Sequence, residues 1–366
     1  MSFLWYWPAG GWDFDVWKRR RTWEPVSSAQ SGKPEPLSLI APGATRGDWE
    51  SSAKTWRGVS NQILGTLTDQ PPKEMRWEWL GPTYHTDKYD LRRLRYTLTD
   101  SEWGYAWLLL PKQPIAKNAA VIAHHQTSCS GKSEPIGLDY VSDERAGVYY
   151  AREMAERGFT VLAPDAIAFG ERQSGHRNTR YHSADEFFAA HPHGSVMGKM
   201  AYDSSRAVDL LQKLPETQAK KIGCVGHSHG AYGTLFAMVA DERITAGVMS
   251  CGVSLLRDDS APDRWWRKTS LIPRLGYYEG KIDHTPIDFH HWLALCAPRP
   301  VFVIGGTQDT IFPNQAALPK RIEMVREVYG LYDAKHALES DVFDGPHSFR
   351  DPARERAYAM LEKALA

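Results

Sequence analysis

The feature that most constrains the fold is a short apolar strand that runs directly into a serine flanked by glycines. The strand spans Ile222 to Val225 and leads into Gly226-His227-Ser228-His229-Gly230, a G-x-S-x-G pentapeptide. Apolar residues then recur at helical spacing, at Ala231, Leu235, Met238 and Val239. A strand, a sharp turn at serine and a helix expose a nucleophilic hydroxyl above a sheet, and glycines let the strand and helix approach closely. We interpret the stretch as a nucleophile elbow rather than an ordinary glycine-rich turn.

Predicted strands and helices alternate on both sides of this elbow. Apolar runs predict further strands at 91–98, 105–110, 119–123, 159–163, 244–250, 300–304 and 338–343. Helical periodicity predicts helices at 49–67, 145–157, 202–214 and 351–365. This alternation predicts an α/β fold with a mostly parallel central sheet and helices on both faces.

Three segments lie outside the alternation. Two of them, about 173–204 and 254–292, follow predicted strands, and we expect these insertions to form a cap at the carboxyl ends of the strands, where open α/β sheets bind ligands. The third is an N-terminal arm and linker at 1–48, before the α/β domain predicted for 49–366. The arm is aromatic-rich and carries tryptophans at positions 5, 7, 12, 17 and 23. It either packs on its own domain or reaches an active-site mouth or a neighbouring subunit, which would allow a homo-oligomer.

Composition narrows the class of protein. The chain of 366 residues is 42% hydrophobic and 24% charged, and its 44 basic and 44 acidic residues give no net charge. This composition predicts a folded domain with a sizeable core, and the balance of charge gives no indication of a nucleic-acid-binding surface. No apolar run approaches the roughly 20 residues that span a bilayer. The first residues lack the pattern of a signal peptide, and the expected location is cytoplasmic, with no membrane partner.

A serine nucleophile needs a general base and a carboxylate that orients the base, and in the elbow fold these follow in the order serine, acid, histidine. Asp309 follows the strand predicted at 300–304, and His347 lies between the last strand and the last helix. We therefore predict Ser228, Asp309 and His347 as the catalytic triad. Asp258 and Asp259 are weaker candidates for the acid, because no strand delivers them directly.

An acyl-transfer site also needs backbone N–H donors aimed at the developing oxyanion. One donor is expected from His229, directly after the nucleophile. The other is expected from the loop after the strand at 119–123, with Thr127 preferred and Gln126 as the alternative.

At this point the chain resembles the serine esterases of the α/β-hydrolase superfamily that group with dienelactone hydrolases and acetyl xylan esterases. The resemblance runs from about Trp49 to the C-terminus. It is carried by His125-Gln126-Thr127, Ala163-Pro164-Asp165, Phe169-Gly170-Glu171-Arg172, the elbow, Ala297-Pro298-Arg299-Pro300, Asp309 and His347. Dienelactone hydrolases proper use a cysteine nucleophile, so Ser228 places the chain with the esterases. The resemblance implies the same triad at Ser228, Asp309 and His347.

The predicted function is therefore a serine carboxylic-ester hydrolase that acts through an acyl-enzyme on a small acyl, sugar or aryl ester. Candidate substrate-binding residues are His125, His227, Trp265 and Trp266, although core packing of the second insertion accounts for its two tryptophans equally well. Neither a metal nor an organic cofactor is implied. An acyltransferase, a peptidase with the same triad and a catalytically silent binding protein of this fold are the alternatives.

Overall fold

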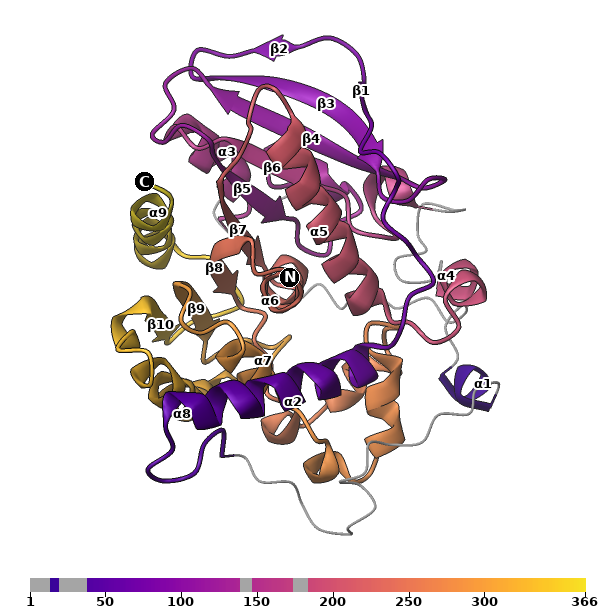
Figure 1. Cartoon of the computed structure of the whole chain (residues 1–366), viewed down its shortest axis with the longest axis vertical. Helices are drawn as coiled ribbons and strands as arrows, with labels where there is room; N and C mark the ends of the chain where they lie inside the picture. The colour runs from indigo at the N-terminus through magenta and orange to yellow at the C-terminus, as the bar shows by residue number, and fades with distance from the viewer. Residues whose placement is uncertain (1–13, 20–37, 139–146, 174–183) are drawn as a thin grey trace.

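A single mixed sheet forms the centre of the molecule (Figure 1). The computed structural model describes residues 14–19, 38–138, 147–173 and 184–366. Within these residues the sheet has ten strands in the order β1-β3-β4-β6-β5-β7-β8-β9-β10, and β2 pairs with β3. The strands are β1 (Trp77–Trp79), β2 (Tyr84–His85), β3 (Tyr89–Thr97), β4 (Trp103–Pro111), β5 (Ala119–His124), β6 (Val161–Pro164), β7 (Lys221–His227), β8 (Ile244–Ser250), β9 (Val301–Gly306) and β10 (Leu338–Phe343).

The sheet has a parallel part and an antiparallel part. Strands β6, β5, β7, β8, β9 and β10 run parallel to one another, whereas β1, β2, β3 and β4 form an antiparallel edge that joins the parallel part through the antiparallel β4–β6 pair. The carboxyl ends of the parallel strands therefore lie along one edge of the sheet, where ligands bind in open α/β folds. The prediction of a mostly parallel sheet is confirmed.

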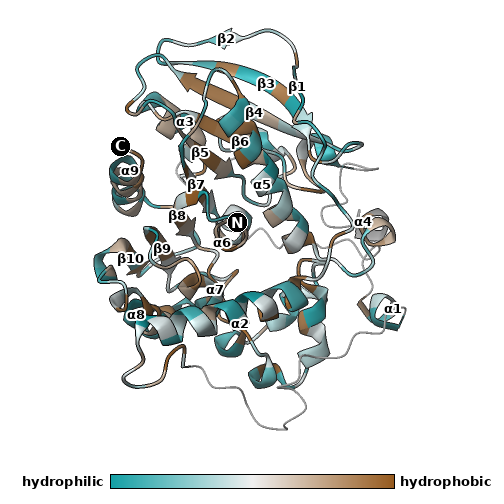
Figure 2. Ribbon diagram, in the orientation of Figure 1, coloured by the Kyte–Doolittle hydropathy of each residue, from teal (hydrophilic) through white to brown (hydrophobic). Residues whose placement is uncertain are grey.

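Helices cover both faces of this sheet and bury two separate apolar layers. On one face α3 (Tyr150–Glu156) and α9 (Asp351–Leu365) pack against the strands. The other face carries α2 (Arg46–Leu64), α5 (Val196–Lys213), α6 (His229–Ala240), α7 (Phe289–Ala294) and α8 (Leu318–Gly330). The outer helix α2 mixes hydrophilic and hydrophobic residues (Figure 2), whereas α6 is buried along almost its whole length. The elbow helix is thus a core element of the fold.

Most predicted elements lie where the sequence places them. Strands β8 and β10 and helix α9 have the predicted bounds. The helix predicted from Tyr202 begins earlier, at Val196, because Ser195 accepts a hydrogen bond from the Gly198 N–H and caps its first turn. The segment predicted as the first insertion therefore ends before position 204. The short edge strands β1 and β2 were not predicted.

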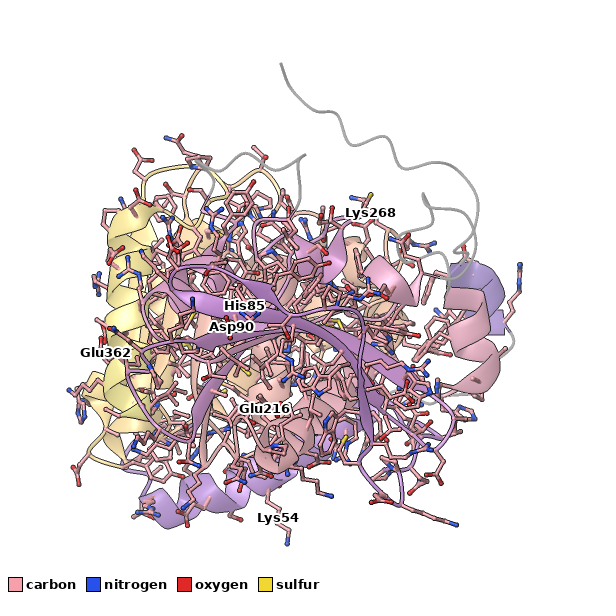
Figure 3. All side chains as sticks on the ribbon, turned by 90° about the horizontal axis from the view of Figure 1, so that it is seen from above. Lys54, His85, Asp90, Glu216, Lys268 and Glu362 are labelled. Carbon is pink, nitrogen blue, oxygen red and sulfur yellow. The ribbon has the colours of Figure 1, made fainter. Side chains whose placement is uncertain are left out.

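Polar side-chain contacts stabilise the antiparallel edge of the sheet. His85 and Asp90 lie 2.8 Å apart (Nδ1 to Oδ1) across the β2–β3 pair, and both are labelled in Figure 3. Arg92 of β3 donates to Glu216, which lies after α5, at 2.6 Å. The first contact ties β2 to β3, and the second joins the antiparallel edge to the body of the domain.

The described part of the N-terminal arm packs on its own chain. Helix α1 (Phe14–Arg19) buries Phe14 and Trp17. The Trp17 ring contacts Phe188 of α4 (Ala184–Ala190) at 5.9 Å and Tyr277 at 6.3 Å between centroids. Helix α1 therefore touches both insertions. The other arm tryptophans lie outside the described residues, and a role for them at a site mouth or subunit interface stays a prediction.

The second insertion is built mainly from 3-10 turns. They lie at Leu256–Asp258, Pro262–Trp265, Pro273–Tyr278 and Ile282–His284, and helix α7 then follows with Asp288 as its cap. Among the described residues, no helix is both long enough and apolar enough to cross a membrane.

Candidate active site

Ser228 stands at a strained turn between β7 and α6. Its backbone has φ 56° and ψ −117°, a conformation that L-residues rarely adopt. A Cβ at Gly226 would lie 2.1 Å from the carbonyl oxygen of Gly230, and a Cβ at Gly230 would lie 2.1 Å from that of His124. Both glycines are therefore required by close backbone contacts. The predicted elbow geometry is present, and Ser228 lies at the carboxyl end of β7.

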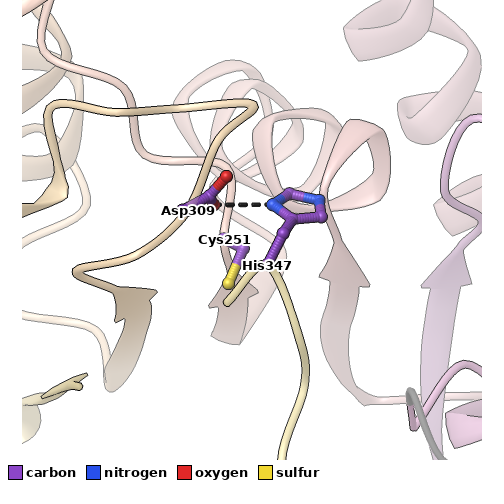
Figure 4. A group of neighbouring side chains, drawn as sticks. All are labelled: Cys251, Asp309 and His347. Atoms are coloured by element: carbon purple, nitrogen blue, oxygen red, sulfur yellow. Dashed lines mark hydrogen bonds and ion pairs between the residues drawn. The ribbon is translucent and has the colours of Figure 1, made fainter. Parts of the chain in front are cut away.

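Asp309 lies in a short loop after β9 and is almost completely buried. Its Oδ1 accepts hydrogen bonds from the backbone N–H groups of Ile311, at 2.8 Å, and Phe312, at 2.9 Å. Its Oδ2 accepts a hydrogen bond from Nδ1 of His347 at 2.6 Å, shown as the dashed line in Figure 4. Because two backbone donors fix one carboxylate oxygen, the other is directed at the imidazole. The structure brings the predicted acid and base together.

The loops that carry the acid and the base are joined to each other. The backbone N–H of Thr307 donates to Phe343 O at 2.9 Å, and the N–H of Gln308 donates to Gly345 O at 2.9 Å. The side chains of Thr307 and Gln308 both donate to Asp344 Oδ1, at 3.0 and 2.9 Å. A Cβ at Gly306 would lie 2.5 Å from two carbonyl oxygens of the second loop. The Asp309–His347 pair thus belongs to one interlocked unit.

His347 lies beside the elbow, between two other rings. The ring of His227, the residue before Ser228, lies 4.7 Å from the His347 ring, and the Phe312 ring lies 5.9 Å from it. Nε2 of His347 is buried and has no hydrogen-bond partner among the described residues. No hydrogen bond joins it to Ser228 in this state. Catalytic hydrogen bonds are often long in ligand-free enzymes, so the arrangement is compatible with a base that faces the serine.

The neighbouring histidine does not compete for the proton. Burial lowers the pKa of His227 well below its ordinary value, and the nearby His347 lowers it further. A hydrogen bond of 3.0 Å joins Nδ1 of His227 to the Ser250 hydroxyl. His227 is therefore neutral at neutral pH, so the imidazole beside the His347 ring carries no charge.

The predicted oxyanion donors come from two segments that pack against each other. His229 is the first residue of α6, where backbone N–H groups have no partner within the helix. Gln126 and Thr127 follow β5 and are half-buried. The close contact of Gly230 with the backbone of His124 and His125 holds this loop against the elbow.

The four side chains predicted to bind substrate are all buried. His125 and His227 make hydrogen bonds with protein groups. The Trp265 ring contacts Tyr232 at 5.1 Å and Phe289 at 4.9 Å, and Trp266 is equally enclosed. These placements favour core packing over substrate contact for both tryptophans. They also favour a role for both histidines in holding neighbouring protein groups.

The rival acids are engaged elsewhere. Asp258 pairs with Arg321 at 2.6 Å, and Asp259 makes a two-pronged contact with Arg264 at 2.9 and 3.0 Å. Neither carboxylate makes a hydrogen bond with His347.

Cys251 approaches the acid and base in a way that the sequence did not indicate. Its Sγ, a carboxylate oxygen of Asp309 and a ring nitrogen of His347 all lie within 4.8 Å of one another (Figure 4). Sulfur, nitrogen and oxygen are zinc ligands, but Nδ1 of His347 and Oδ2 of Asp309 are joined by a hydrogen bond of 2.6 Å, which is shorter than the separation of two ligands around one zinc ion. The thiol instead donates to Ser348 O at 3.5 Å, and burial raises the pKa of Cys251 to about 12. These three side chains are therefore engaged in hydrogen bonds rather than arranged around a metal ion.

Fold and site together define an α/β-hydrolase, and comparisons with known proteins give the family. The profile described as "Dienelactone hydrolase family" matches residues 141–365. The chain belongs to this family and is a carboxylic ester hydrolase. It is 27% identical over 319 residues to "Putative hydrolase YtaP" of Bacillus subtilis (strain 168), covering 83% of this chain and 97% of that protein.

Other similarities are partial or structural. A match of 26% identity over 142 residues to "Carbohydrate esterase MZ0003", from an unknown prokaryotic organism, covers 35% of this chain and 32% of the relative. The glucuronoyl esterase from Solibacter usitatus superposes with a TM-score of 0.68 at 15% identity, covering 91% of this chain and 98% of that one. A glucuronoyl esterase from Teredinibacter turnerae T7901 gives 0.64 at 17% identity, covering 93% and 90%. At these identities the two structures establish the fold alone.

Proposed function

We propose that the chain hydrolyses its ester through an acyl-enzyme formed on Ser228, with His347 as general base and Asp309 as the carboxylate that orients it. The observation that carries this proposal is the hydrogen bond of 2.6 Å between Asp309 and Nδ1 of His347. It leaves Nε2 as the basic nitrogen, beside the elbow and without another described partner. This is the tautomer that a serine needs from its base.

In the acylation step, Nε2 of His347 accepts the proton of the Ser228 hydroxyl as the oxygen attacks the ester carbonyl carbon. The carbonyl oxygen becomes an oxyanion, which the backbone N–H of His229 and an N–H of the 126–127 loop stabilise. When the tetrahedral intermediate collapses, the bond to the alcohol oxygen breaks, and the imidazolium returns the proton to the departing alcohol. The buried Asp309 carboxylate stabilises the imidazolium meanwhile.

Deacylation repeats these steps with water as the nucleophile. His347 takes a proton from the water, and the hydroxyl oxygen attacks the acyl carbon. Collapse of the second intermediate returns the proton to Ser228 and releases the carboxylic acid. The chemistry consumes one water for each ester and requires no redox step.

The substrate class that we propose is a small ester on a sugar. Among small acyl, sugar and aryl esters, the name of the partial relative, carbohydrate esterase, supports the sugar ester. The two insertions follow β6 and β8 at the edge where Ser228 lies, and this position supports the proposal that they act as a cap that selects the substrate. A panel of acetylated sugars, aryl esters and lactones, compared by kcat/KM, tests this assignment, and a preference for simple aryl esters over every acetylated sugar would contradict it.

The nucleophile is tested with p-nitrophenyl acetate and Ser228→Ala. We expect wild-type protein to release a burst of p-nitrophenol and to carry one acetyl group on Ser228 after acid quenching, because the activated phenol leaves quickly and hydrolysis of the acyl-enzyme is then the slower step. Ser228→Ala is expected to show neither. The matched control is Ser205→Ala on α5, whose hydroxyl bonds to Ala201 O of the same helix. Turnover by Ser228→Ala at the rate of this control would refute the proposal.

A further inference from the structure

The loop after β5 is held by an imidazole whose tautomer can be assigned. Nε2 of the buried His125 lies 3.0 Å from the backbone nitrogen of Ala166, and its Nδ1 lies 2.6 Å from the carbonyl oxygen of Gln126. A backbone N–H can only donate and a carbonyl can only accept. Nε2 is therefore the acceptor, and Nδ1 carries the proton that it donates to Gln126.

The same reasoning applies to His229. Its Nδ1 lies 3.3 Å from the carbonyl oxygen of His125, so Nδ1 donates here as well. The two rings stack with centroids 5.6 Å apart and planes 21° apart, and Phe169 contacts both. Two successive carbonyl groups thus receive hydrogen bonds from a pair of stacked imidazoles.

Peptide planarity converts these contacts into directions for the N–H groups. In a trans peptide the C=O and the following N–H point in opposite directions within one plane. Because the His125 and Gln126 carbonyls point to the stacked rings, the N–H groups of Gln126 and Thr127 point away from them. Successive N–H groups on one side of the backbone form a concave site that binds anions.

We propose that His125 and His229 are a pair of positioning residues that direct the Gln126 and Thr127 N–H groups together at the oxyanion formed on Ser228. The proposal rests on the esterase function and adds to it two side chains with a defined role and tautomer. It also replaces the choice between Gln126 and Thr127 as donor with joint use of both amides.

Other features of the loop support this role over direct contact with substrate. The Gln126 side chain donates to Oε1 of the buried Glu134 at 2.8 Å, which fixes the loop from its other side. Both imidazoles are only 1% exposed. Burial lowers the pKa of both imidazoles, most strongly that of His229. Because His125 therefore stays neutral, its Nε2 keeps the lone pair that accepts the hydrogen bond from Ala166.

Two matched pairs of variants test the proposal, because asparagine and glutamine replace different ring nitrogens. The amide nitrogen of asparagine lies near the place of Nδ1, whereas the amide of glutamine lies near that of Nε2. Complete loss of an oxyanion donor costs about 100- to 1,000-fold in kcat. We expect kcat for p-nitrophenyl acetate to fall about 10- to 100-fold in His125→Gln and His229→Gln, with KM little changed. His125→Asn and His229→Asn should keep most of the activity, because each keeps a donor at the Nδ1 position.

Affinity for phenylboronic acid provides a second readout, since its tetrahedral adduct places an oxygen where the oxyanion forms. The inhibition constant should rise in the two Gln variants in proportion to their loss of kcat. His124→Gln is the control, because it removes another buried histidine of this region, which bonds to Ser204 and Thr234. It should lower the melting temperature without a matching loss of kcat.

The outcomes separate positioning from other roles. Equal activities of the Asn and Gln variants at either position would overturn the proposal. A loss of kcat/KM that comes from a higher KM rather than a lower kcat would also overturn it. A Gln variant that does not fold leaves the Asn variant to decide, since the proposal requires Asn to be active. Turnover by Ser228→Ala would instead refute the esterase mechanism, whatever the histidine variants do.

Discussion

Replacing Asp309 by asparagine should trap His347 in the wrong tautomer. Oδ1 of Asp309 accepts two backbone hydrogen bonds, from Ile311 and Phe312, at 2.8 and 2.9 Å. In Asp309→Asn the amide oxygen must keep this place, because the NH2 group would face two donors and leave them unsatisfied. Each buried donor left unsatisfied costs about 1–3 kcal/mol. The NH2 group therefore faces His347 Nδ1, which must become the acceptor, and the proton moves to Nε2.

The size of the effect follows from this loss of the base. In the trypsin-like triad the equivalent change lowers kcat about 10,000-fold, close to 5.5 kcal/mol of transition-state stabilisation. Asp309 is likewise buried and accepts a hydrogen bond of 2.6 Å from Nδ1 of the histidine, so we expect a comparable fall in kcat. KM should change little, since Asp309 has no exposed surface for substrate.

The assay is steady-state hydrolysis of p-nitrophenyl acetate, with melting temperature measured in parallel. Asp258→Asn is the matched control, because it removes one charge from a neighbouring candidate acid that pairs with Arg321. This variant should keep its kcat although it loses stability, because Arg321 is buried and removing the charge of its partner costs up to about 3–5 kcal/mol. Full activity in Asp309→Asn, or its loss only in Asp258→Asn, would refute the assignment of the acid.

Three further predictions concern other parts of the fold. Gly230→Ala should lower kcat and should lower the free energy of unfolding by about 1–3 kcal/mol, because its added Cβ would overlap the His124 carbonyl. Gly58→Ala on α2 is the control, and it should be neutral or stabilising because its added Cβ meets nothing within 4 Å. Equal urea midpoints for the two variants would contradict this prediction. Trp17→Ala should speed tryptic cleavage after Lys18 and Arg19, because Trp17 docks α1 on Phe188 and Tyr277; an unchanged cleavage rate would show that other contacts hold the helix. Burial lowers the pKa of His124 from 6.5 to about 3, so the unfolded chain binds more protons than the folded chain between these values and stability must fall as pH falls through this window. We measure the free energy of unfolding in urea from pH 7 to pH 4. It should fall less steeply with falling pH in His124→Gln than in the wild type, by up to about 1.4 kcal/mol per pH unit. Identical slopes for the two proteins would refute the attribution to His124.

The sequence predicts the elements whose signals are local. Strand β8 and helix α9 are uninterrupted patterns of one period, so their bounds are recovered from 244–250 and 351–365. The elbow combines a strand, a glycine-flanked serine and a helix within a few residues. The start of α5 was missed because Val196-Met197-Gly198 carries little helical periodicity, although Ser195 was a readable cap. Strands β1 and β2 are too short to show a period of their own.

The site was predictable as far as strand order determines it. Asp309 and His347 follow β9 and β10, which are parallel neighbours, so their approach follows from topology. The directions of side chains depend on tertiary packing and were not predictable. Trp265 and Trp266 are the clearest case, because the sequence of an aromatic-rich insertion is the same whether its indoles face a ligand or the core, and both are buried. The positions of Cys251 and Phe312 beside the Asp309–His347 pair had no sequence signal for the same reason.

The interlocked acid and base loops have a consequence for motion during turnover. Backbone and side-chain hydrogen bonds join the Thr307–Gln308 segment to the loop that carries His347, whereas Ser228 belongs to a different strand and helix. Any rearrangement that brings Nε2 of His347 onto the serine hydroxyl therefore moves Asp309 and His347 as one body. The Nδ1 proton shared by this pair should give a downfield NMR resonance in both the ligand-free and the ligand-bound protein. Only the contact between base and nucleophile would then respond to the presence of substrate.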